Sequence, residues 1–326
     1  MLEDKYGRKL THLRISVTYR CNYSCIFCHR EGELNGRDFL KPEHIGLVSY
    51  VAARLGIRYY KLTGGEPLLR NDIAKIVAEI KREGGGEVSI TTNGFFLKER
   101  IKDLVDAGLD RVNVSLHSLK KDVYRLLTGI DGLEKVLEGL KLVKEYGLPV
   151  KLNFVLTGYN YGEVKTLIDF ASQNGFSINI IEVIPVGLGN LTFDKIFYNI
   201  DNVTSYLEKI ATKKIIRDLQ SRPVYFLPSG IRVELIGSYC NPEFCAKCSK
   251  IRLTHDGKLK PCINRNDNLV EISWILESNL SKEEKINLLT KAFYKANELR
   301  EPYFRLENGI CKSFDGKIKG KPRKIG

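Results

Sequence analysis

Three observations predict an α/β fold, built as an incomplete (β/α)6 TIM-type barrel with a C-terminal extension. The first 185 residues alternate short, β-branched apolar runs with longer amphipathic segments, which is the pattern of repeated βα units. After Pro185 this alternation gives way to glycine-rich turns, and a compact group of cysteines follows. The length of 326 residues suits one barrel with an extension. We therefore expect a barrel over residues 1–185, an extension over 186–311 and a basic tail over 312–326.

Six apolar runs in the barrel region are expected to form strands of a parallel sheet. These runs are His12–Thr18, Tyr59–Thr63, Glu87–Thr92, Arg111–His117, Val150–Thr157 and Ser177–Ile184. The segment Asn71–Arg82 has a helical pattern, and its Asn-Asp start suits a helix N-terminus because a side-chain oxygen can accept from the free N–H groups there. Six βα units leave such a barrel open on one side, and functional residues are expected where the strands end.

The region after the barrel is expected to form a separate module. Two further β-like runs lie near Val224–Leu227 and Ile231–Ile236, and an amphipathic helix is expected over Ser281–Leu299. The last segment, Lys312–Gly326, is basic and contains glycine and proline. Composition alone therefore predicts a mobile end for the chain.

Composition and charge restrict the class of protein. The 43% of hydrophobic residues and 28% of charged residues are ordinary for a globular chain and exclude disordered and collagen-like classes. No apolar run is long enough for a membrane span, and the charged N-terminus lacks the pattern of a signal peptide, so we expect a cytoplasmic protein. The net charge of +13 suggests an anionic partner such as nucleic acid, a membrane surface or a phosphate-bearing small molecule. Charge does not choose among these, and a generally basic surface is an equal alternative.

Three cysteines follow the first predicted strand with the spacing Cys21-x3-Cys25-x2-Cys28. Grouped thiols in a chain without a signal peptide point to metal and not to disulfides. A structural zinc site or an electron-transfer cluster normally has a fourth protein ligand. Three thiolates instead leave one iron of a [4Fe–4S] cluster free for S-adenosylmethionine (SAM), and the spacing resembles that of the radical SAM superfamily.

The segment Thr63-Gly64-Gly65-Glu66-Pro67 at the end of the second predicted strand supports this interpretation. Two glycines allow the backbone to approach a ligand closely, while the Glu-Pro pair can fix the turn and accept from an amine. Alone, this string is more often a simple turn. Beside the cysteine loop, it resembles the element that binds the SAM amine in radical SAM enzymes.

A second group of cysteines, Cys245-x2-Cys248-x13-Cys262, lies in the extension, with Cys240 as a potential fourth ligand. Asp-Gly at 256–257 predicts a hairpin that brings the last of the three back to the other two. Two alternatives fit, namely a four-thiolate zinc site or a second [4Fe–4S] cluster with a free iron that faces substrate.

Two cations lie between these cysteines. Lys250 and Arg252 occupy alternate positions of a predicted strand, so they share one face and would present two positive charges beside the free iron. Cations in this position suit an anionic substrate such as a triphosphate.

Four segments together resemble the GTP 3′,8-cyclase family of molybdenum cofactor biosynthesis, in an archaeal style. They are His12–Gly32, Lys61–Arg70, Arg111–Leu119 and the second cysteine group with its cation pair. The resemblance implies a radical SAM lyase that converts GTP to (8S)-3′,8-cyclo-7,8-dihydroguanosine 5′-triphosphate. It also implies two [4Fe–4S] clusters, of which the first cleaves SAM and the second binds the guanine.

The resemblance also assigns roles to residues of this chain. The metal ligands implied are Cys21, Cys25, Cys28, Cys245, Cys248 and Cys262. The SAM contacts implied are Phe27, Gly65, Ser115 and Ile184. The GTP contacts implied are Arg14, Lys61, Thr91, Lys151, Lys250, Ile251 and Arg252. Arg14, Lys61 and Lys151 lie on candidate barrel strands, where a charge that points inwards is costly unless an anionic ligand meets it. The alternative is that each of them points outwards from the barrel as a surface cation.

Some positions depart from the family pattern. Tyr19 replaces an aspartate, lysines 61 and 250 replace arginines, Ile184 replaces a methionine, and the chain ends in a single glycine, Gly326, where two are usual. A lysine keeps the charge but loses the bidentate fork of arginine. In the family the extreme C-terminus reaches into the active site, so the same insertion is expected here, with Arg323 directed at GTP or at the barrel wall.

Two other functions compete with this one. The first is a radical SAM enzyme with an auxiliary cluster that acts on a peptide or a tetrapyrrole, and the second is a basic zinc module that binds nucleic acid. The cations are not gathered into a stripe with interleaved aromatic residues, so we expect neither nucleic acid nor a membrane as a partner. An electron donor such as a ferredoxin or a flavodoxin is expected, and a homodimer is left open.

Overall fold

The computed structural model describes residues 1–33 and 36–322. Its strands are β1 His12–Ser16, β2 Tyr59–Thr63, β3 Glu87–Thr92, β4 Arg111–Ser115, β5 Val150–Leu156, β6 Ser177–Glu182, β7 Lys213–Arg217, β8 Arg222–Phe226, β9 Arg232–Ile236, β10 Lys250–Leu253, β11 Lys258–Lys260, β12 Val270–Glu271, β13 Phe304–Glu307, β14 Ile310–Ser313 and β15 Lys319–Gly320. Its α-helices are α1 Pro42–Arg54, α2 Ile73–Gly84, α3 Leu97–Asp106, α4 Lys121–Thr128, α5 Leu133–Glu145, α6 Val164–Asn174, α7 Gly189–Ile196, α8 Asp201–Ile210, α9 Pro242–Ala246, α10 Ser273–Glu277 and α11 Lys282–Glu298. Four short 3-10 helices, η1 Arg30–Gly32, η2 Pro67–Leu69, η3 Tyr161–Glu163 and η4 Leu219–Ser221, complete the described elements.

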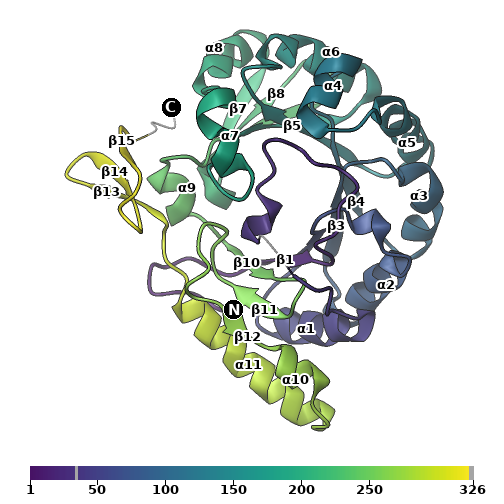
Figure 1. The fold of residues 1–326 in the computed structure, drawn as a ribbon, viewed down its shortest axis with the longest axis vertical. Helices are drawn as coiled ribbons and strands as arrows, with labels where there is room; N and C mark the ends of the chain where they lie inside the picture. The colour runs from purple at the N-terminus through teal and green to yellow at the C-terminus, as the bar shows by residue number, and fades with distance from the viewer. Residues whose placement is uncertain (34–35, 323–326) are drawn as a thin grey trace.

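The six predicted barrel strands are confirmed, and the extension supplies two more parallel strands. Strands β1 to β6 pair in chain order, while β10 pairs in parallel with β1 and β9 pairs in parallel with β6. Figure 1 shows these strands as the inner wall, with α2, α3, α5 and α6 around the outside. The barrel wall is therefore built from both predicted domains.

The apolar side chains of the strands and of the surrounding helices form one large buried core. Fully buried positions alternate along β5, where Leu152, Phe154 and Leu156 are all buried while the residues between them are half-buried. The cavity inside the barrel is lined by half-buried residues such as Lys151 and Asn153 and also by buried polar residues such as Asn113 and Glu234. Within the described residues, no helix is both long and apolar enough to cross a membrane.

Helix α2 begins where the sequence predicted, but its N-terminus is held differently. Asp72 is the N-cap residue, yet its side chain makes no capping hydrogen bond. Instead the carboxylate accepts from Arg70, with Nε at 2.7 Å and Nη2 at 2.6 Å. The predicted contact with the helix N–H groups was therefore wrong, because a neighbouring guanidinium offers two charge-assisted bonds.

The predicted hairpin and the predicted long helix of the extension are both present. Strands β10 and β11 pair antiparallel on either side of Gly257, whose φ of 87° falls in the left-handed region that glycine tolerates. Helix α11 starts at a capping box in which Ser281 and Glu284 satisfy each other's backbone N–H groups. The hairpin thus carries the segment after β11 back towards the cysteines before β10.

A hairpin of β7 and β8 extends the sheet beyond β9, and its turn contacts the opposite end of the barrel wall. Between the two strands, Gln220 and Ser221 have positive φ values of 63° and 46°. The Gln220 amide N–H donates to Lys247 O at 3.0 Å, and its side-chain carbonyl accepts from Lys250 Nζ at 2.8 Å. The turn therefore bridges the side that six βα units leave open.

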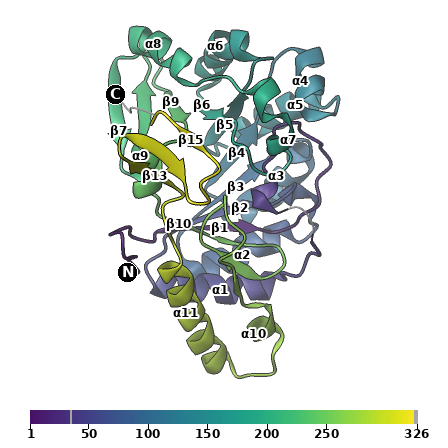
Figure 2. The same ribbon diagram turned by 60° about the vertical axis from the view of Figure 1, so that its left-hand side comes forward.

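Residues 304–320 form a small sheet instead of a mobile end. Strands β13, β14 and β15 pair antiparallel, and this sheet lies beside α9 in both views (Figures 1 and 2). A disulfide joins Cys311 of this sheet to Cys240, and both cysteines are buried. The expected tail boundary at 311/312 falls within β14, and the predicted mobility of 312–322 is wrong because backbone pairing and the disulfide hold this stretch. Arg323 and Gly326, and with them the predicted insertion of the C-terminus, lie outside the described residues.

Candidate active site

The barrel encloses a cavity that both cysteine groups line. Its volume is about 400 Å³, and its wall includes all six predicted cluster cysteines. Cationic side chains of β1, β2, β5 and β10 line the same cavity. The structure therefore brings the sequence-predicted residues of both domains to one place.

The first cysteine group lies in the loop after β1, which the end of α4 holds in position. Ser24 N donates to Thr128 O and Ile26 N donates to Leu127 O, both at 3.1 Å. Cys21 is exposed, whereas Cys25 and Cys28 are half-buried. Backbone hydrogen bonds thus fix a loop that presents three sulfur atoms to the cavity.

Desolvation by the surrounding protein favours the protonated form of the thiols of this loop, including that of Cys21, although the residue as a whole is exposed. This desolvation raises the pKa of Cys21 to about 11, and it also raises the pKa values of Cys25 and Cys28 above their ordinary range. Iron binds the thiolate, so loading a cluster would displace the protons of these thiols. Three thiols with no nearby fourth cysteine fit a cluster that keeps one free iron.

The two glycines after β2 let the chain approach the cysteine loop closely. A Cβ on Gly64 would lie 2.2 Å from Thr18 O, and one on Gly65 would lie 2.0 Å from Arg20 O. Both distances are far inside van der Waals contact, so no side chain fits at either position. The glycines are therefore required by the packing of the β2 loop against residues 18–20, which lead into the first cysteine group.

Glu66 fixes this turn through internal hydrogen bonds. It accepts from Leu68 N at 2.9 Å, Thr92 Oγ1 at 2.6 Å and Asn93 N at 2.7 Å. Burial raises its pKa to about 7 in spite of these donors. The part of the prediction in which Glu66 fixes the turn is confirmed, while its predicted contact with an amine stays a prediction.

The four residues predicted to contact SAM all line the cavity beside this loop. Phe27 packs edge-on against the ring of His117 with 4.6 Å between ring centroids, Ser115 ends β4, and Ile184 follows β6. His117 was not predicted from the sequence. Its Nδ1 accepts from Val155 N at 3.1 Å, and burial lowers its pKa to about 3, so it is a neutral ring that supports Phe27.

The second cysteine group is drawn together from three places in the extension. Cys245 lies in α9, Cys248 precedes β10 and Cys262 follows β11. Phe304 N donates to Cys245 Sγ at 3.5 Å, and Gln220 Nε2 donates to Cys248 Sγ at 3.8 Å. N–H donors directed at sulfur are typical of iron–sulfur ligands.

The ionisation of these thiols is uneven. Burial raises the pKa of Cys245 to about 12 and raises that of Cys262 as well. Burial also opposes ionisation of Cys248, but Lys250 and Arg300 bring its pKa below the ordinary value. The cations of this region therefore favour at least one thiolate before any metal binds.

In this structure Cys240 cannot serve as the fourth ligand of a zinc site. Cys240 is bonded to Cys311 and has no thiol to offer. Within residues 1–33 and 36–322, no three His, Cys, Asp or Glu side chains, those of the second cysteine group included, are arranged to hold one single metal ion, whereas a four-iron cluster takes its thiolates on separate irons. The donor set at the second group is thus three cysteines, which fits a cluster with one free iron better than a closed zinc shell.

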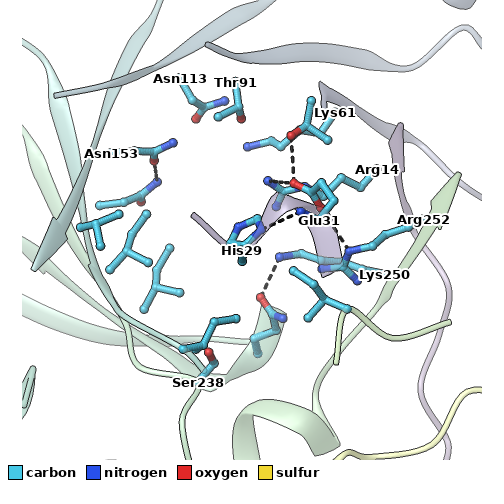
Figure 3. A pocket seen from close by; sticks show the side chains of 18 of the residues that line it. Arg14, His29, Glu31, Lys61, Thr91, Asn113, Asn153, Ser238, Lys250 and Arg252 are labelled. Carbon is cyan, nitrogen blue, oxygen red and sulfur yellow. Dashed lines mark hydrogen bonds and ion pairs between the residues drawn. The ribbon is translucent and has the colours of Figure 1, made fainter. Parts of the chain in front are cut away.

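A row of cations crosses the cavity wall on three neighbouring strands. Arg252 of β10 is in register with Arg14 of β1, which is in register with Lys61 of β2. Residues in register on adjacent strands share a face, so the three side chains point together into the cavity, as Figure 3 shows. Burial and the neighbouring cations lower the pKa values of Lys61 and Lys250 well below their ordinary range.

The prediction that Lys250 and Arg252 share a face agrees with the structure, whereas Ile251 faces the other way. Its side chain is fully buried in the hydrophobic core and does not line the cavity. Successive side chains of a strand point to opposite faces, so this outcome follows from the position of Ile251 between two cavity residues. The predicted GTP contact of Ile251 stays a prediction, and in this arrangement its backbone, not its side chain, would make the contact.

Glu31 occupies the centre of this cation row and was not predicted from the sequence. Its Oε1 lies 2.9 Å from Arg14 Nη2 and accepts from Thr63 Oγ1 at 2.9 Å, while its Oε2 lies 3.5 Å from Arg252 Nε (Figure 3). Burial alone would raise the pKa of Glu31, but Arg14 and the other cations lower it to about 2. An acidic residue three positions after Cys28 was the signal that could have identified it.

The backbone around Glu31 is held in an unusual conformation. Arg30 and Glu31 have positive φ values of 46° and 53°, which non-glycine residues adopt only when their surroundings enforce them. Lys260 of β11 enforces this geometry by donating to Glu31 O at 3.1 Å and to Gly32 O at 3.0 Å. The extension therefore sets the position of a carboxylate that belongs to the barrel loop.

The remaining predicted GTP residues lie on the far strands of the cavity. Thr91 of β3 lines the cavity beside Asn113 of β4, with which it is in register (Figure 3). Lys151 of β5 forms an ion pair with Glu234 of β9. The cations are thus divided between two carboxylates, Glu31 on one side and Glu234 on the other.

Comparison with protein families and curated proteins gives consistent results. Residues 15–171 match the family model of the radical SAM superfamily, and residues 176–306 match the family model named Molybdenum Cofactor Synthesis C. The chain is 44% identical over 306 residues to a probable GTP 3′,8-cyclase of Metallosphaera sedula, covering 93% of this chain and 96% of the relative. It is 46% identical over 304 residues to a probable GTP 3′,8-cyclase of Saccharolobus solfataricus, covering 93% of this chain and 98% of the relative.

Solved structures with a similar fold are more distant in sequence. Streptococcus suis SuiB bound to S-adenosylmethionine has a TM-score of 0.63 at 18% identity, over 88% of this chain and 68% of SuiB. The protein anSMEcpe with bound AdoMet has a TM-score of 0.54 at 14% identity, over 86% of this chain and 84% of that one. At these identities the likeness establishes the fold alone.

Proposed function

Since this chain belongs to the GTP 3′,8-cyclase family of radical SAM enzymes, we propose that it converts GTP to (8S)-3′,8-cyclo-7,8-dihydroguanosine 5′-triphosphate with SAM and two [4Fe–4S] clusters. This reaction is an early step of molybdenum cofactor biosynthesis. One observation carries the proposal. Two sets of three cysteines line a single cavity, and an in-register row of cations lies on the wall of that cavity.

Cys21, Cys25 and Cys28 would hold the first cluster. When bound, that cluster supplies the electron that cleaves SAM to methionine and a 5′-deoxyadenosyl radical. Gly65, Ser115, Phe27 and Ile184 would surround SAM, because all of them line the cavity beside the cysteine loop. Half-buried Phe27, supported by His117, suits an apolar contact with adenine.

Cys245, Cys248 and Cys262 would hold the second cluster, whose free iron would face the guanine. Lys250 and Arg252 are placed directly between these cysteines in the chain and face the cavity. Arg14 and Lys61 extend the positive row towards β2. GTP has a guanine base at one end and a negatively charged triphosphate at the other. A cavity wall that combines a free iron with several cations suits both ends.

Glu31 is the internal counterion of this row. A buried group of cations without any anion would be strongly destabilised, and the contacts of Glu31 with Arg14 and Arg252 offset that cost in the empty cavity. Buried Glu31 Oε2 and both guanidinium Nε atoms have no hydrogen-bond partner among the described residues. These polar atoms would be available to GTP or to ordered water.

The test of this function is a reconstituted reaction. The protein would be loaded anaerobically with iron and sulfide and incubated with SAM, GTP and dithionite in place of the ferredoxin or flavodoxin that we propose as the donor. We expect about eight irons per chain, GTP-dependent 5′-deoxyadenosine and the cyclised nucleotide. Formation of 5′-deoxyadenosine that GTP does not stimulate, without any cyclised product, would contradict the proposal.

Replacement of Arg252 by alanine is expected to weaken GTP binding. Loss of one charge-assisted contact costs about 1.5–3 kcal/mol, which is roughly tenfold to a hundredfold in Kd. Equilibrium dialysis with GTP on the reconstituted protein measures this change. Arg82→Ala is the control, since Arg82 is an exposed residue of α2 that lies outside the cavity. Equal Kd values for the Arg252 variant and the unmodified protein would remove Arg252 from the binding site.

A further inference from the structure

A second cluster of cations surrounds Glu234 on the side of the cavity formed by β5, β7, β8 and β9. Glu234 is 1% exposed, and its Oε1 lies 2.9 Å from Arg222 Nε. Arg217 Nη1 lies 3.4 Å from the same oxygen, and Lys151 forms an ion pair with the other oxygen. All four side chains line the cavity that holds both cysteine groups.

This cluster carries more positive charge than Glu234 can balance. Three cations share one carboxylate, and no second carboxylate lies within ion-pair distance of them among the residues that the structure describes. The side chains of Lys151 and Arg222 are only 18% and 8% exposed, so water screens them poorly. Excess charge in such a place is costly unless an anionic ligand meets it.

The ionisation of these groups reflects the same imbalance. Burial lowers the pKa of Lys151 to about 8 and that of Arg222 to about 10, although Glu234 opposes both shifts. Burial would raise the pKa of Glu234, but Arg222, Lys151 and Arg217 lower it to about 2. The carboxylate is therefore fully ionised at neutral pH, and the cations have capacity for more negative charge.

The hairpin that carries two of these arginines also contacts the second cysteine group. Arg217 and Arg222 are paired residues at the end of the β7–β8 hairpin. The turn between them contains Gln220, which accepts from Lys250 Nζ and donates to Cys248 Sγ. The β7–β8 hairpin thus places the two arginines close to the segment that is proposed to bind guanine. A nucleotide bound at the second cluster would therefore have these cations as neighbours.

We propose that Arg222 and Arg217, together with Lys151, bind the triphosphate of GTP, and that Glu234 is the internal counterion which the triphosphate displaces. This inference rests on the proposed function. It adds three residues to the site, Arg217, Arg222 and Glu234, which neither the sequence motifs nor the family comparison indicated. Glu234 competes with the phosphates for the same guanidinium groups, so it lowers the affinity for GTP while it stabilises the empty protein.

The test compares ligands with and without phosphates on the reconstituted holoenzyme. Arg222→Gln is expected to weaken the binding of GTP and of inorganic tripolyphosphate by roughly tenfold to a hundredfold, with guanosine binding unchanged. Arg222→Lys keeps the charge and should retain most of the affinity. Glu234→Gln is expected to bind GTP several-fold more tightly than the unmodified protein, and tripolyphosphate should raise its lowered thermal stability.

A matched control separates binding from structure. Arg70→Gln removes an ion pair whose arginine side chain is 10% exposed and lies outside the cavity, so it should lower thermal stability without changing the Kd for GTP. Affinities for GTP within twofold of the unmodified protein in both Arg222→Gln and Glu234→Gln would overturn the inference, even if the enzyme forms the cyclised product. If tripolyphosphate binding depends on Arg222 but no cyclised product forms, the anion site stands and the proposed reaction fails.

Discussion

Serine at both Cys245 and Cys248 is expected to leave an enzyme that still cleaves SAM slowly but forms at least about a hundredfold less cyclised product, because a guanine that is misplaced by about 1 Å loses this much rate. The two cysteines belong to the extension, whereas the loop with Cys21, Cys25 and Cys28 is held by β1 and α4. Iron should therefore fall from about eight to about four per chain. Iron analysis and quantification of both products measure this outcome.

The control for this double variant replaces the other two cysteines, Cys240 and Cys311, with serine. These residues form a disulfide and do not belong to either proposed ligand set. The control should keep about eight irons and should unfold at a lower temperature, because a closed loop of 71 residues is opened. Loss of the first cluster in the Cys245/Cys248 variant would show that the two cysteine groups do not act as separate modules.

Replacement of Cys25 by alanine is expected to reduce 5′-deoxyadenosine to the level of a protein-free control. Cys25 is the central residue of the first group, is half-buried and packs against the hydrophobic core. Two thiolates do not retain the cluster that SAM requires. About four irons should remain at the second group, which makes iron analysis a readout that does not depend on activity.

This variant should still bind GTP, since the second group and the cation row are intact. A Kd for GTP close to that of the unmodified protein, together with no cleavage of SAM, would separate the two sites. Retained cleavage of SAM by Cys25→Ala would contradict the assignment of the first cluster. Cys28→Ala offers a second test of the same loop, because it removes a ligand that is half-buried like Cys25.

Much of the barrel could be predicted because its signals are local. The six strand runs and the hairpin at Gly257 follow from short-range patterns of apolar residues and from glycine at a turn. The shared face of Lys250 and Arg252 follows from the two-residue repeat of a strand, and the same rule places the side chain of Ile251 on the other face. The cysteine spacings are also local, since the three cysteines of each group lie within one short segment of the sequence.

The carboxylates of the site could not be predicted in the same way. Glu31 belongs to the cysteine loop, but its contacts come from β1, β2 and β10. Glu234 interrupts an apolar strand run, which marks it as unusual, yet its three cationic partners lie on other strands that are 12 to 83 residues away in the chain. The function of a buried charge depends on such partners, and no spacing in the sequence reveals them.

The sequence by itself determined the βα repeats, the two sets of three thiols and the cations on the strands. Only the tertiary structure decided that β9 and β10 of the extension join opposite ends of the barrel wall. It also decided that β15 and the Cys240–Cys311 disulfide hold much of the basic C-terminal segment, and that Glu31 and Glu234 divide the cations of the cavity. The physical reason is that strand order, disulfide pairing and ion pairing depend on contacts between distant segments, whereas helix, turn and ligand spacing depend on neighbouring residues.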